Sequence, residues 1–315
     1  MIHQRLNSPD PAVRRVAVLD LPYSDEEDDI APLLVAALAD ADAGVRLEAA
    51  KALEGFEEPE VLRALVPKLA DADAAVRDAT AATLAELKQP ASAAFVLPWI
   101  AQPTPTVKAA ALRAVKALRV PDAFLPALAA LADADALVRR EAVGVLGYLK
   151  DTRAIGALTE LAAHDPEADV RRAAVGALGF AHESAGLSVQ PALTRALSDG
   201  AWQVREEAAT TLGKLRGAVA VGELIHALAD AYWQVRLKAA RSLGKQKARA
   251  ALPALVEALQ HPISNLRKEA VIALGELGDA RAITPLERAL ADSDPDVRKL
   301  AKLALASLQL NGVPR

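Results

Sequence analysis

The sequence contains no cysteine, one methionine and few aromatic residues: three Trp, three Tyr and four Phe in 315 positions. The absence of cysteine excludes a disulfide framework, a thiolate nucleophile and any cysteine-ligated zinc or iron–sulfur site. No charge of one sign dominates either, because 37 Lys and Arg oppose 41 Asp and Glu, leaving a net charge of −4. The chain therefore has no general attraction for nucleic acid or for an anionic membrane surface.

Long hydrophobic runs are missing as well. The opening residues, MIHQRLNSPDPAVRR, contain no apolar core of the kind that a signal peptide needs. Asp, Glu, Lys or Arg interrupts every stretch of helix length, so no window reaches 18 consecutive apolar residues. We expect a soluble, cytoplasmic protein whose partner is neither a membrane nor a nucleic acid.

What the sequence does have is alanine, at more than seventy positions within a hydrophobic content of 52%. Alanine loses the least side-chain entropy in a helix, and it is depleted in strands. Small side chains also let two backbones approach closely. The composition therefore predicts an all-α fold of closely packed helices.

A five-residue pattern, V-R-x-x-A, recurs along the whole chain at intervals of 31 to 34 residues. We call its first residue the anchor of each repeat. A basic residue follows every anchor, and it is Arg in nine repeats and Lys108 in the fourth. Such a period is the signature of a repeat architecture. The ten anchors are Val13, Val45, Val76, Val107, Val138, Val170, Val204, Val235, Leu266 and Val297.

Each repeat has the pattern of two short amphipathic helices. In residues 267–294, apolar side chains recur at helical spacing on both sides of a turn at Gly278 and Asp279. Pro285 falls in the opening turn of the helix that follows, where a missing N–H costs little. Neither helix can bury its apolar stripe alone, so neighbouring repeats have to stack on one another.

Units such as VRREAVGVLGYLKDTRAIGALTELAAHD and VRRAAVGALGFAHE resemble the HEAT-like repeats of the phycobilisome-lyase class. The resemblance covers essentially the whole chain. It implies a right-handed α-solenoid of about ten helical hairpins of about 31 residues. We expect a single array over residues 1–315 with no domain boundary. The class includes scaffolds, chromophore lyases and a metal-dependent hydroxylase, so the resemblance specifies the fold more closely than the function.

Acidic residues keep the register of the repeat at two positions, five and three residues before the anchor. One interpretation of the first set is a polar ladder for a ligand. The resemblance implies instead that these Asp pair with Arg between and within repeats, and we favour this structural interpretation. The second set is placed to cap the second helix, a contribution of about 1 kcal/mol each. The first set is Asp40, Asp71, Asp133, Asp165, Asp199, Asp230 and Asp292, and the second is Asp10, Asp42, Asp73, Asp135 and Asp294.

Five consecutive acidic residues, Asp25 to Asp29, precede an early helix. Negative charge at this place complements the helix N-terminus. We favour a solvated helix start, and the alternative is a docking site for a basic partner.

Two neighbouring repeats depart from the common pattern together. Trp202 and Trp233 stand two residues before their anchors, where the other repeats carry Pro, Ala or Ser. The same repeats have Ala201 and Tyr232 in place of the usual capping residue. Stacked repeats would set the two Trp side by side. Paired indoles can anchor a partner, because Trp and Tyr dominate binding hot spots; the alternative is that both only pack on the adjoining helix.

The residues around the two Trp extend the predicted surface. The resemblance implies that the second helices line the concave face, where positions two, three and six past the anchor face outward. Their mixed charge suits a protein partner better than a phosphate track. An insertion at 182–186 lies beside this region, and loop insertions tend to cluster on a binding face. The candidate partner-binding residues are Trp202, Trp233, Tyr232, Gln203, Gln234, Tyr148, Phe180, Arg172, Glu206, Leu237 and Arg241.

Patterns for catalysis or metal binding are weak. No two of the five histidines have the four-residue spacing that would face one metal from a helix. The resemblance implies that the hydroxylase relatives use several His-Glu pairs as iron ligands, whereas this chain has one, His182-Glu183. Ser184 near His182 does not make a catalytic triad, because adjacency in sequence does not set its geometry. We predict no catalytic residue, no metal and no cofactor.

These observations favour a non-catalytic scaffold or adaptor that binds another protein on its concave face, centred on repeats five to eight. A long pre-formed surface loses little conformational entropy on binding. The alternative is a phycobilin-lyase-like or other cofactor-handling enzyme subunit, which aromatic and Arg side chains would also suit. The sequence does not identify the partner.

Overall fold

The computed structural model describes residues 2–23, 29–180, 186–215 and 217–311, and these residues form helices and turns without a strand. The prediction of an all-α fold is therefore confirmed. No helix in these ranges has the length and apolar character that a membrane span requires.

Contacts between Cα atoms divide the chain into two compact units, Met1–Leu149 and Lys150–Arg315, which we call unit 1 and unit 2. A single array over residues 1–315 stays a prediction. The α-helices of unit 1 are α1 (Ile2–Leu6), α2 (Pro11–Asp20), α3 (Ala31–Ala37), α4 (Ala43–Ala52), α5 (Pro59–Leu65), α6 (Ala74–Ala85), α7 (Ala93–Val96), α8 (Pro105–Lys116), α9 (Phe124–Ala130) and α10 (Ala136–Leu149). Its 3-10 helices are η1 (Leu21–Tyr23), η2 (Val66–Ala70), η3 (Pro90–Ser92), η4 (Leu97–Ala101) and η5 (Pro121–Ala123).

Unit 2 continues the same alternation of short and longer helices. Its α-helices are α11 (Ile155–His164), α12 (Ala168–Ala177), α13 (Gly186–Ala196), α14 (Trp202–Leu212), α15 (Val221–Ala227), α16 (Trp233–Lys245), α17 (Leu252–Ala258), α18 (Ser264–Leu277), α19 (Ile283–Ala289) and α20 (Pro295–Asn311). Its 3-10 helices are η6 (Thr152–Ala154), η7 (Leu178–Phe180), η8 (Arg249–Ala251) and η9 (Ala280–Ala282).

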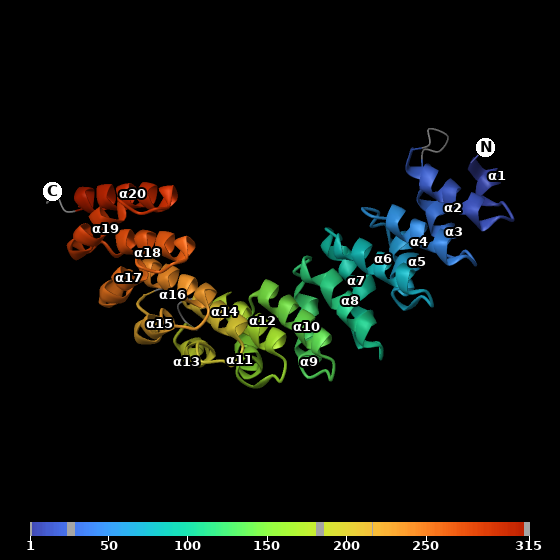
Figure 1. The fold of residues 1–315 in the computed structure, drawn as a ribbon. Coiled ribbons are helices and arrows are strands. Elements are labelled where there is room, and N and C mark those ends of the chain that lie inside the picture. The colour runs from blue at the N-terminus through green and yellow to red at the C-terminus, as the bar shows by residue number, and fades with distance from the viewer. Residues whose placement is uncertain (1, 24–28, 181–185, 216, 312–315) are drawn as a thin grey trace. The chain divides into compact units, whose positions relative to one another are not determined.

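Within each unit the helices form two layers, as Figure 1 shows. In unit 2 the second helices of the repeats pack on one another in the order α12, α14, α16, α18 and α20, and each also packs on the first helix of its own repeat. In unit 1 the second helices follow one another in the same way, from α2 to α10. The predicted α-solenoid of stacked helical hairpins is confirmed.

Proline shortens two first helices in unit 1. Pro67 lies in η2, directly after α5, and Pro98 lies in η4, directly after α7. Proline has no N–H to donate and clashes with the preceding turn, so an α-helix cannot run through it unchanged. These first helices therefore continue as 3-10 turns.

Glycine lets the second helices of unit 2 approach closely. Gly213, Gly244 and Gly275 share the position nine past the anchor. A Cβ atom added to Gly244 would lie 2.8 Å from the Cα of Ala273, and one added to Gly275 would lie 2.9 Å from the Cβ of Ala304. The small residues predicted from composition thus set the spacing of the layers.

The basic residue after the anchor joins one repeat to the next. Arg46 Nε and Nη2 donate to the two carboxylate oxygens of Asp71 at 2.9 and 2.8 Å. Its Nη1 donates to the backbone carbonyls of Asp40 and Ala41 at 2.9 and 3.1 Å. We call this set of ion pairs the Arg–Asp ladder, and it confirms the structural interpretation of these residues. Further pairs are Arg14–Asp40, Lys108–Asp133, Arg171–Asp199, Arg205–Asp230 and Arg267–Asp292.

The acidic residues also satisfy backbone donors at the start of each second helix. Asp71 Oδ1 accepts from the N–H of Asp73 at 3.0 Å. Asp73 Oδ1 in turn accepts from the N–H groups of Ala75 and Val76 at 2.8 and 3.2 Å. All five predicted capping residues accept such a bond: Asp10, Asp42, Asp73, Asp135 and Asp294.

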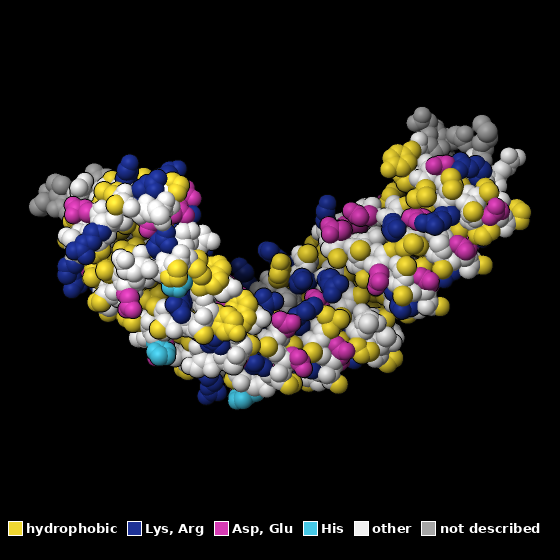
Figure 2. Space-filling model, viewed as in Figure 1, with side chains coloured by type: hydrophobic (Ala, Val, Ile, Leu, Met, Phe, Trp, Pro, Cys, Tyr) yellow, Lys and Arg dark blue, Asp and Glu magenta, His cyan; other side chains and the backbone are white. Residues whose placement is uncertain are grey.

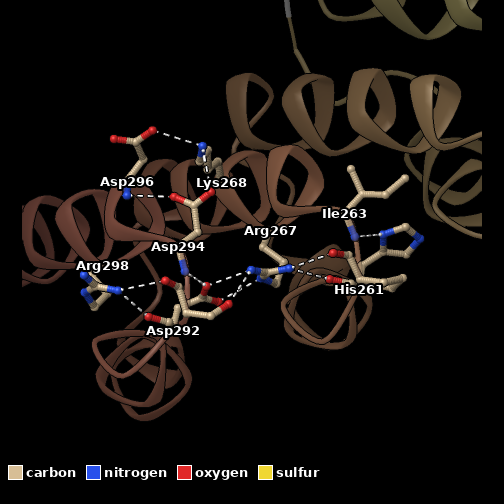
Figure 3. Close-up of polar contacts among 10 residues, drawn as sticks. His261, Ile263, Arg267, Lys268, Asp292, Asp294, Asp296 and Arg298 are labelled. Carbon is tan, nitrogen blue, oxygen red and sulfur yellow. Dashed lines mark hydrogen bonds and ion pairs between the residues drawn. The ribbon is translucent and has the colours of Figure 1, made fainter.

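Figure 3 shows this arrangement at the end of unit 2. Arg267 donates to both carboxylate oxygens of Asp292 at 2.8 Å and to the carbonyls of His261 and Pro262 at 2.9 and 3.1 Å. Asp294 accepts from Lys268 Nζ at 3.0 Å, and this hydrogen bond lowers the pKa of Asp294 to about 2.

The prediction that position three past the anchor faces solvent is wrong in four repeats. Ala110 occupies this position in one of them and is buried. Glu48, Glu141 and Glu269 occupy it in the other three, and all three are buried. Their carboxylates pair with basic side chains of the preceding repeat, so this side of the second helix faces the neighbouring helix rather than water. The partners are Arg15 for Glu48, Arg113 for Glu141 and Arg241 for Glu269.

The acidic run falls mostly outside the described residues, which exclude 24–28. Its last member, Asp29, accepts a hydrogen bond from the N–H of Ala31 at 3.1 Å. Ala31 is the first residue of α3, so this carboxylate lies at a helix start, as predicted for the run.

Candidate functional site

Four second helices of unit 2, α12, α14, α16 and α18, begin without a side-chain cap. Trp202 is the first residue of α14, and the residue before it, Ala201, caps no backbone N–H with its side chain. Trp233 is the first residue of α16, and the preceding Tyr232 likewise provides no side-chain cap. The loss expected from sequence is confirmed, at a cost of about 1 kcal/mol for each helix. The cap positions hold Ala201 before α14 and Tyr232 before α16, and each is followed by a Trp.

The rings of Trp202 and Tyr232 stack on each other. Their centroids are 5.4 Å apart and their planes lie within 13° of parallel. Stacked rings contribute about 0.5–1.5 kcal/mol beyond the area that they bury. We expected Trp202 beside Trp233; the structure places the ring of Tyr232 against it, because Tyr232 comes from the turn before α16. We call Trp202, Tyr232 and Trp233 the aromatic edge.

Arg205 contacts the Tyr232 ring of the aromatic edge. Its guanidinium lies 5.7 Å from the centroid of the Tyr232 ring and makes two hydrogen bonds with Asp230, at 2.7 and 2.9 Å. A cation over an aromatic face is attracted by the ring quadrupole. Sequence reasoning missed this role, because Arg205 is a regular member of the Arg–Asp ladder and nothing in its pattern sets it apart.

The aromatic edge is open to solvent in part. The Tyr232 side chain is exposed at 45%, and both Trp are half-buried. Figure 2 shows hydrophobic side chains grouped on the visible face of unit 2, over the region that α14 and α16 occupy in Figure 1. An aromatic group that is fixed on one side and exposed on the other is suited to contact with a partner.

The two predicted glutamines differ from each other. Gln203 is exposed and free to hydrogen-bond with a ligand, as its position predicts. The Oε1 atom of Gln234 is buried and accepts no hydrogen bond. Gln234 as a whole is half-buried, and its role as a hydrogen-bonding group for a partner stays a prediction.

The other predicted aromatic residues lie apart from this edge. Tyr148 belongs to unit 1, where its ring is 46% exposed and lies 5.4 Å from the guanidinium of Arg119. Phe180 in η7 is only 8% exposed. Its assignment as a contact residue is wrong, because the side chain is packed in the interior of unit 2 near the end of its repeat.

The predicted charged residues have partners within unit 2. Arg241 makes two hydrogen bonds with the buried Glu269, at 2.9 and 2.6 Å, and its side chain remains exposed. Arg172 lies 3.8 Å from Asp169 on the same helix, and it remains exposed.

Two further candidates lie on the second helices of unit 2. Glu206 is 3.8 Å from Lys238 of the next repeat. Leu237 is half-buried. Both retain enough exposure to contact a partner.

No metal site emerges from the part of the chain that the structure describes. No group of three His, Asp or Glu side chains in these residues could hold a metal ion. The predicted insertion at 182–186, with His182, Glu183 and Ser184, lies outside the described residues except for Gly186.

Comparison with known proteins identifies the repeat family of this fold. A family model described as HEAT repeats matches residues 1–85, 30–116, 124–189, 165–231 and 221–306. The sequence has no significant match among curated proteins.

Solved structures with this fold share little sequence identity with the chain. An engineered protein is 21% identical with a TM-score of 0.55, and the match covers 98% of both chains. The Escherichia coli protein YibA is 18% identical with a TM-score of 0.53, over 96% of this chain and 99% of that one. A chain from a structure of Kap95p with RanGDP is 14% identical with a TM-score of 0.69, over 98% of this chain and 51% of that one.

At these identities the structural neighbours show a shared fold alone, whereas the family model matches the sequence itself over most of its length. The stacked hairpins, the repeated anchors and the Arg–Asp ladder agree with that match. This chain belongs to the HEAT-repeat family.

Proposed function

We propose that this protein is a non-catalytic scaffold that binds another protein through the aromatic edge of unit 2. The observation that carries the proposal is the stack of Trp202 on Tyr232 at the start of two uncapped helices. The stack is fixed by contact between two repeats, and the Tyr232 residue is still 45% exposed. An exposed aromatic residue held in one position suits a binding hot spot.

The surrounding residues suit a protein partner. Gln203 on α14, Arg172 on α12 and Leu237 on α16 offer an amide, a guanidinium and an apolar side chain on the second helices of the same three repeats. Interfaces between proteins combine an aromatic centre with such a polar rim. The second helices of repeats six to eight in unit 2, α12, α14 and α16, form the wider surface that we propose for the partner.

The fold supports the same proposal in a general way. A HEAT-repeat array presents a long pre-formed surface, which loses little conformational entropy when a partner binds. The structure of Kap95p with RanGDP contains a neighbour of this fold in complex with a protein. We infer a comparable use of the surface here, with a different and unidentified partner.

The test is a binding measurement on a double variant. The partner is first identified by affinity capture from the source organism and then purified. Trp202→Ala with Tyr232→Ala should weaken its binding by tenfold or more, roughly 1.4 kcal/mol, while the circular dichroism spectrum keeps its helical form at the temperature of the measurement. Tyr23→Ala is the matched control, because Tyr23 is an 88% exposed aromatic residue of unit 1. Equal affinity of the double variant and the wild type would refute the proposed surface.

A further inference from the structure

The Arg–Asp ladder is interrupted within unit 2. Five positions before the anchor Leu266, where the ladder carries Asp in most repeats, the sequence has His261. The basic residue that should pair with this position is Arg236, which follows the anchor Val235. In the described part of the chain Arg236 forms no ion pair.

An Asp at this position would accept a hydrogen bond from a backbone N–H and also pair with the basic residue of the preceding repeat. His261 makes only the first of these contacts. Its Nδ1 accepts a hydrogen bond from the N–H of Ile263 at 3.1 Å, as Asp292 Oδ1 accepts from the N–H of Asp294 at 2.8 Å. An Nδ1 that accepts leaves the proton of the neutral ring on Nε2, which is a donor. Burial, and then the charges of Arg236 and Arg267, lower the pKa of His261 and favour this neutral form.

Arg236 is bound differently from the other ladder arginines. Its Nε donates to the carbonyl of Asp230, a type of contact that Arg205 makes through Nη1 with the carbonyl of Asp199 at 2.8 Å. In the ladder pairs Nε and Nη2 hold the carboxylate. In Arg236 the two terminal nitrogens have no hydrogen-bond acceptor among the described residues. A guanidinium with donors to spare is suited to bidentate binding of a carboxylate.

A pocket of about 440 Å³ adjoins these two side chains. Arg236 and His261 supply donors, whereas Ile225, Leu228 and Leu266 supply apolar wall. Glu257 also lines the pocket, but it is exposed, and water screens the repulsion that it exerts on another anion. The lining residues come from α15, α16, α17 and the start of α18.

We propose that this pocket binds the carboxylate of an Asp or Glu side chain from the partner protein. The carboxylate takes the place that the Asp of the next repeat holds elsewhere in the ladder. Arg236 lies three residues after Trp233 on α16, so both lie on one side of that helix. The inference rests on the proposed function, since it supplies an acidic contact next to the aromatic edge.

The direct test uses a small carboxylate and needs no partner. The histidine ring signals of the full ¹³C-labelled chain are followed by NMR at pH 7.5 during titration with N-acetylglutamate methylamide. N-acetylglutamine methylamide, which has the same shape without the charge, is the matched ligand. We expect a saturable shift of the His261 signals with the acid alone. No saturable shift, or equal shifts with both ligands, would overturn the proposal.

Variants assign the binding to the pocket. Arg236→Gln should weaken binding of the acid at least tenfold. Arg77→Gln is the matched control, because the ladder partner of Arg77 is also replaced, by Gln102, and this variant should leave the His261 titration unchanged. Glu257→Gln should strengthen binding. If Glu257 is itself the occupant in solution, Glu257→Gln will lower thermal stability, and the proposal fails. Saturable binding of inorganic phosphate without binding of the acid would also refute the assignment to a carboxylate.

The substitution His261→Asp tests, without any added ligand, whether Arg236 can bind a carboxylate at this place. It should complete the ladder with an ion pair between Arg236 and the new carboxylate, and raise the melting temperature above that of the wild type. An unchanged or lower melting temperature would contradict the geometry that we infer. The small-ligand titration succeeds or fails independently of the Trp202 and Tyr232 variants, so failure of this inference and failure of the proposed function are distinguishable.

Discussion

Arg46 grips the carboxylate of Asp71 with two hydrogen bonds across the boundary between two repeats, 25 residues apart in the sequence. Both side chains are largely buried, at 13% and 6% exposure. A buried ion pair adds little when compared with an apolar pair, but removal of one partner leaves an isolated charge in a place where water cannot solvate it. The contact thus sets the register between repeats.

Arg46→Gln should therefore lower the free energy of unfolding by about 3 kcal/mol. Glu60→Gln is the control, since Glu60 pairs with Arg63 at an exposed site and its loss should cost less than about 0.5 kcal/mol. Urea unfolding followed by circular dichroism measures both. The double variant Arg46→Gln with Asp71→Asn should be more stable than the sum of the single effects predicts, because it leaves no unpaired charge. Additive effects would show that the two residues do not interact.

Acid should weaken the ladder. Hydrogen bonds from Arg14, Arg46 and Arg267 hold the pKa values of Asp40, Asp71 and Asp292 below their usual range. A carboxyl group whose pKa is lower in the folded state contributes stability above its unfolded pKa, about 3.9, and loses it as the pH falls through the folded value. We expect nearly constant contributions from these groups between about pH 5 and 7 and a steep loss below about pH 4.

The measurement for this prediction is unfolding by urea at a series of pH values. Asp71→Asn should be less stable than the wild type at neutral pH, and the difference should shrink as the pH falls below about 4. A difference that stays constant down to about pH 2 would contradict the assigned cause.

Close approach of the second helices predicts opposite effects of the same substitution at two glycines. Gly244→Ala should destabilise unit 2 by about 1–3 kcal/mol, because the new Cβ would meet the Cα of Ala273 at 2.8 Å. Gly222→Ala, in α15, has no neighbouring atom within 4 Å of the new Cβ and should stabilise the chain by about 0.5 kcal/mol. Thermal unfolding of the two variants compares them directly. Equal melting temperatures would rule out tight packing at Gly244.

Two buried threonines of α6, Thr80 and Thr83, also predict opposite effects of the same substitution. Thr80 Oγ1 is buried with no hydrogen-bond partner, whereas Thr83 Oγ1 donates to the carbonyl of Ala50 at 2.9 Å. Thr80→Val removes an unsatisfied polar group at nearly constant volume and should stabilise the chain by about 1 kcal/mol. Thr83→Val removes a made bond and should cost about 1 kcal/mol or more. Urea unfolding in which both variants shift the same way would disprove this difference.

Several contacts between repeats could be predicted because they follow the period of the sequence. A residue type that recurs at one place in ten stacked units meets the same neighbours in each of them. Asp73 as a helix cap and the pairing of Asp71 with Arg46 were both predictable for this reason. The burial of Glu48 and Glu269 at position three was not, because it depends on which side of one helix faces the next.

The candidate site was predictable as a departure from that period, but its geometry was not. Trp202 and Trp233 stand out in the sequence, yet the ring that stacks on Trp202 belongs to Tyr232. Phe180 occupies the position equivalent to Tyr148 and is nevertheless buried. A residue that departs from the repeat pattern changes the packing around itself. The environment of the same position in the other repeats therefore does not describe it.

The amino-acid sequence by itself determined the helical class, the length of the repeat, the helix caps and the residues of the ladder. The reason is that these depend on neighbours close in the chain or one period away. Tertiary structure alone decided which aromatic rings meet, which charges are buried, and that Arg236 faces a pocket with His261 in place of a carboxylate. Those outcomes depend on how side chains of different helices pack together. The repeat pattern allows several such contacts at each position, and the shape of the neighbouring side chains decides which one forms.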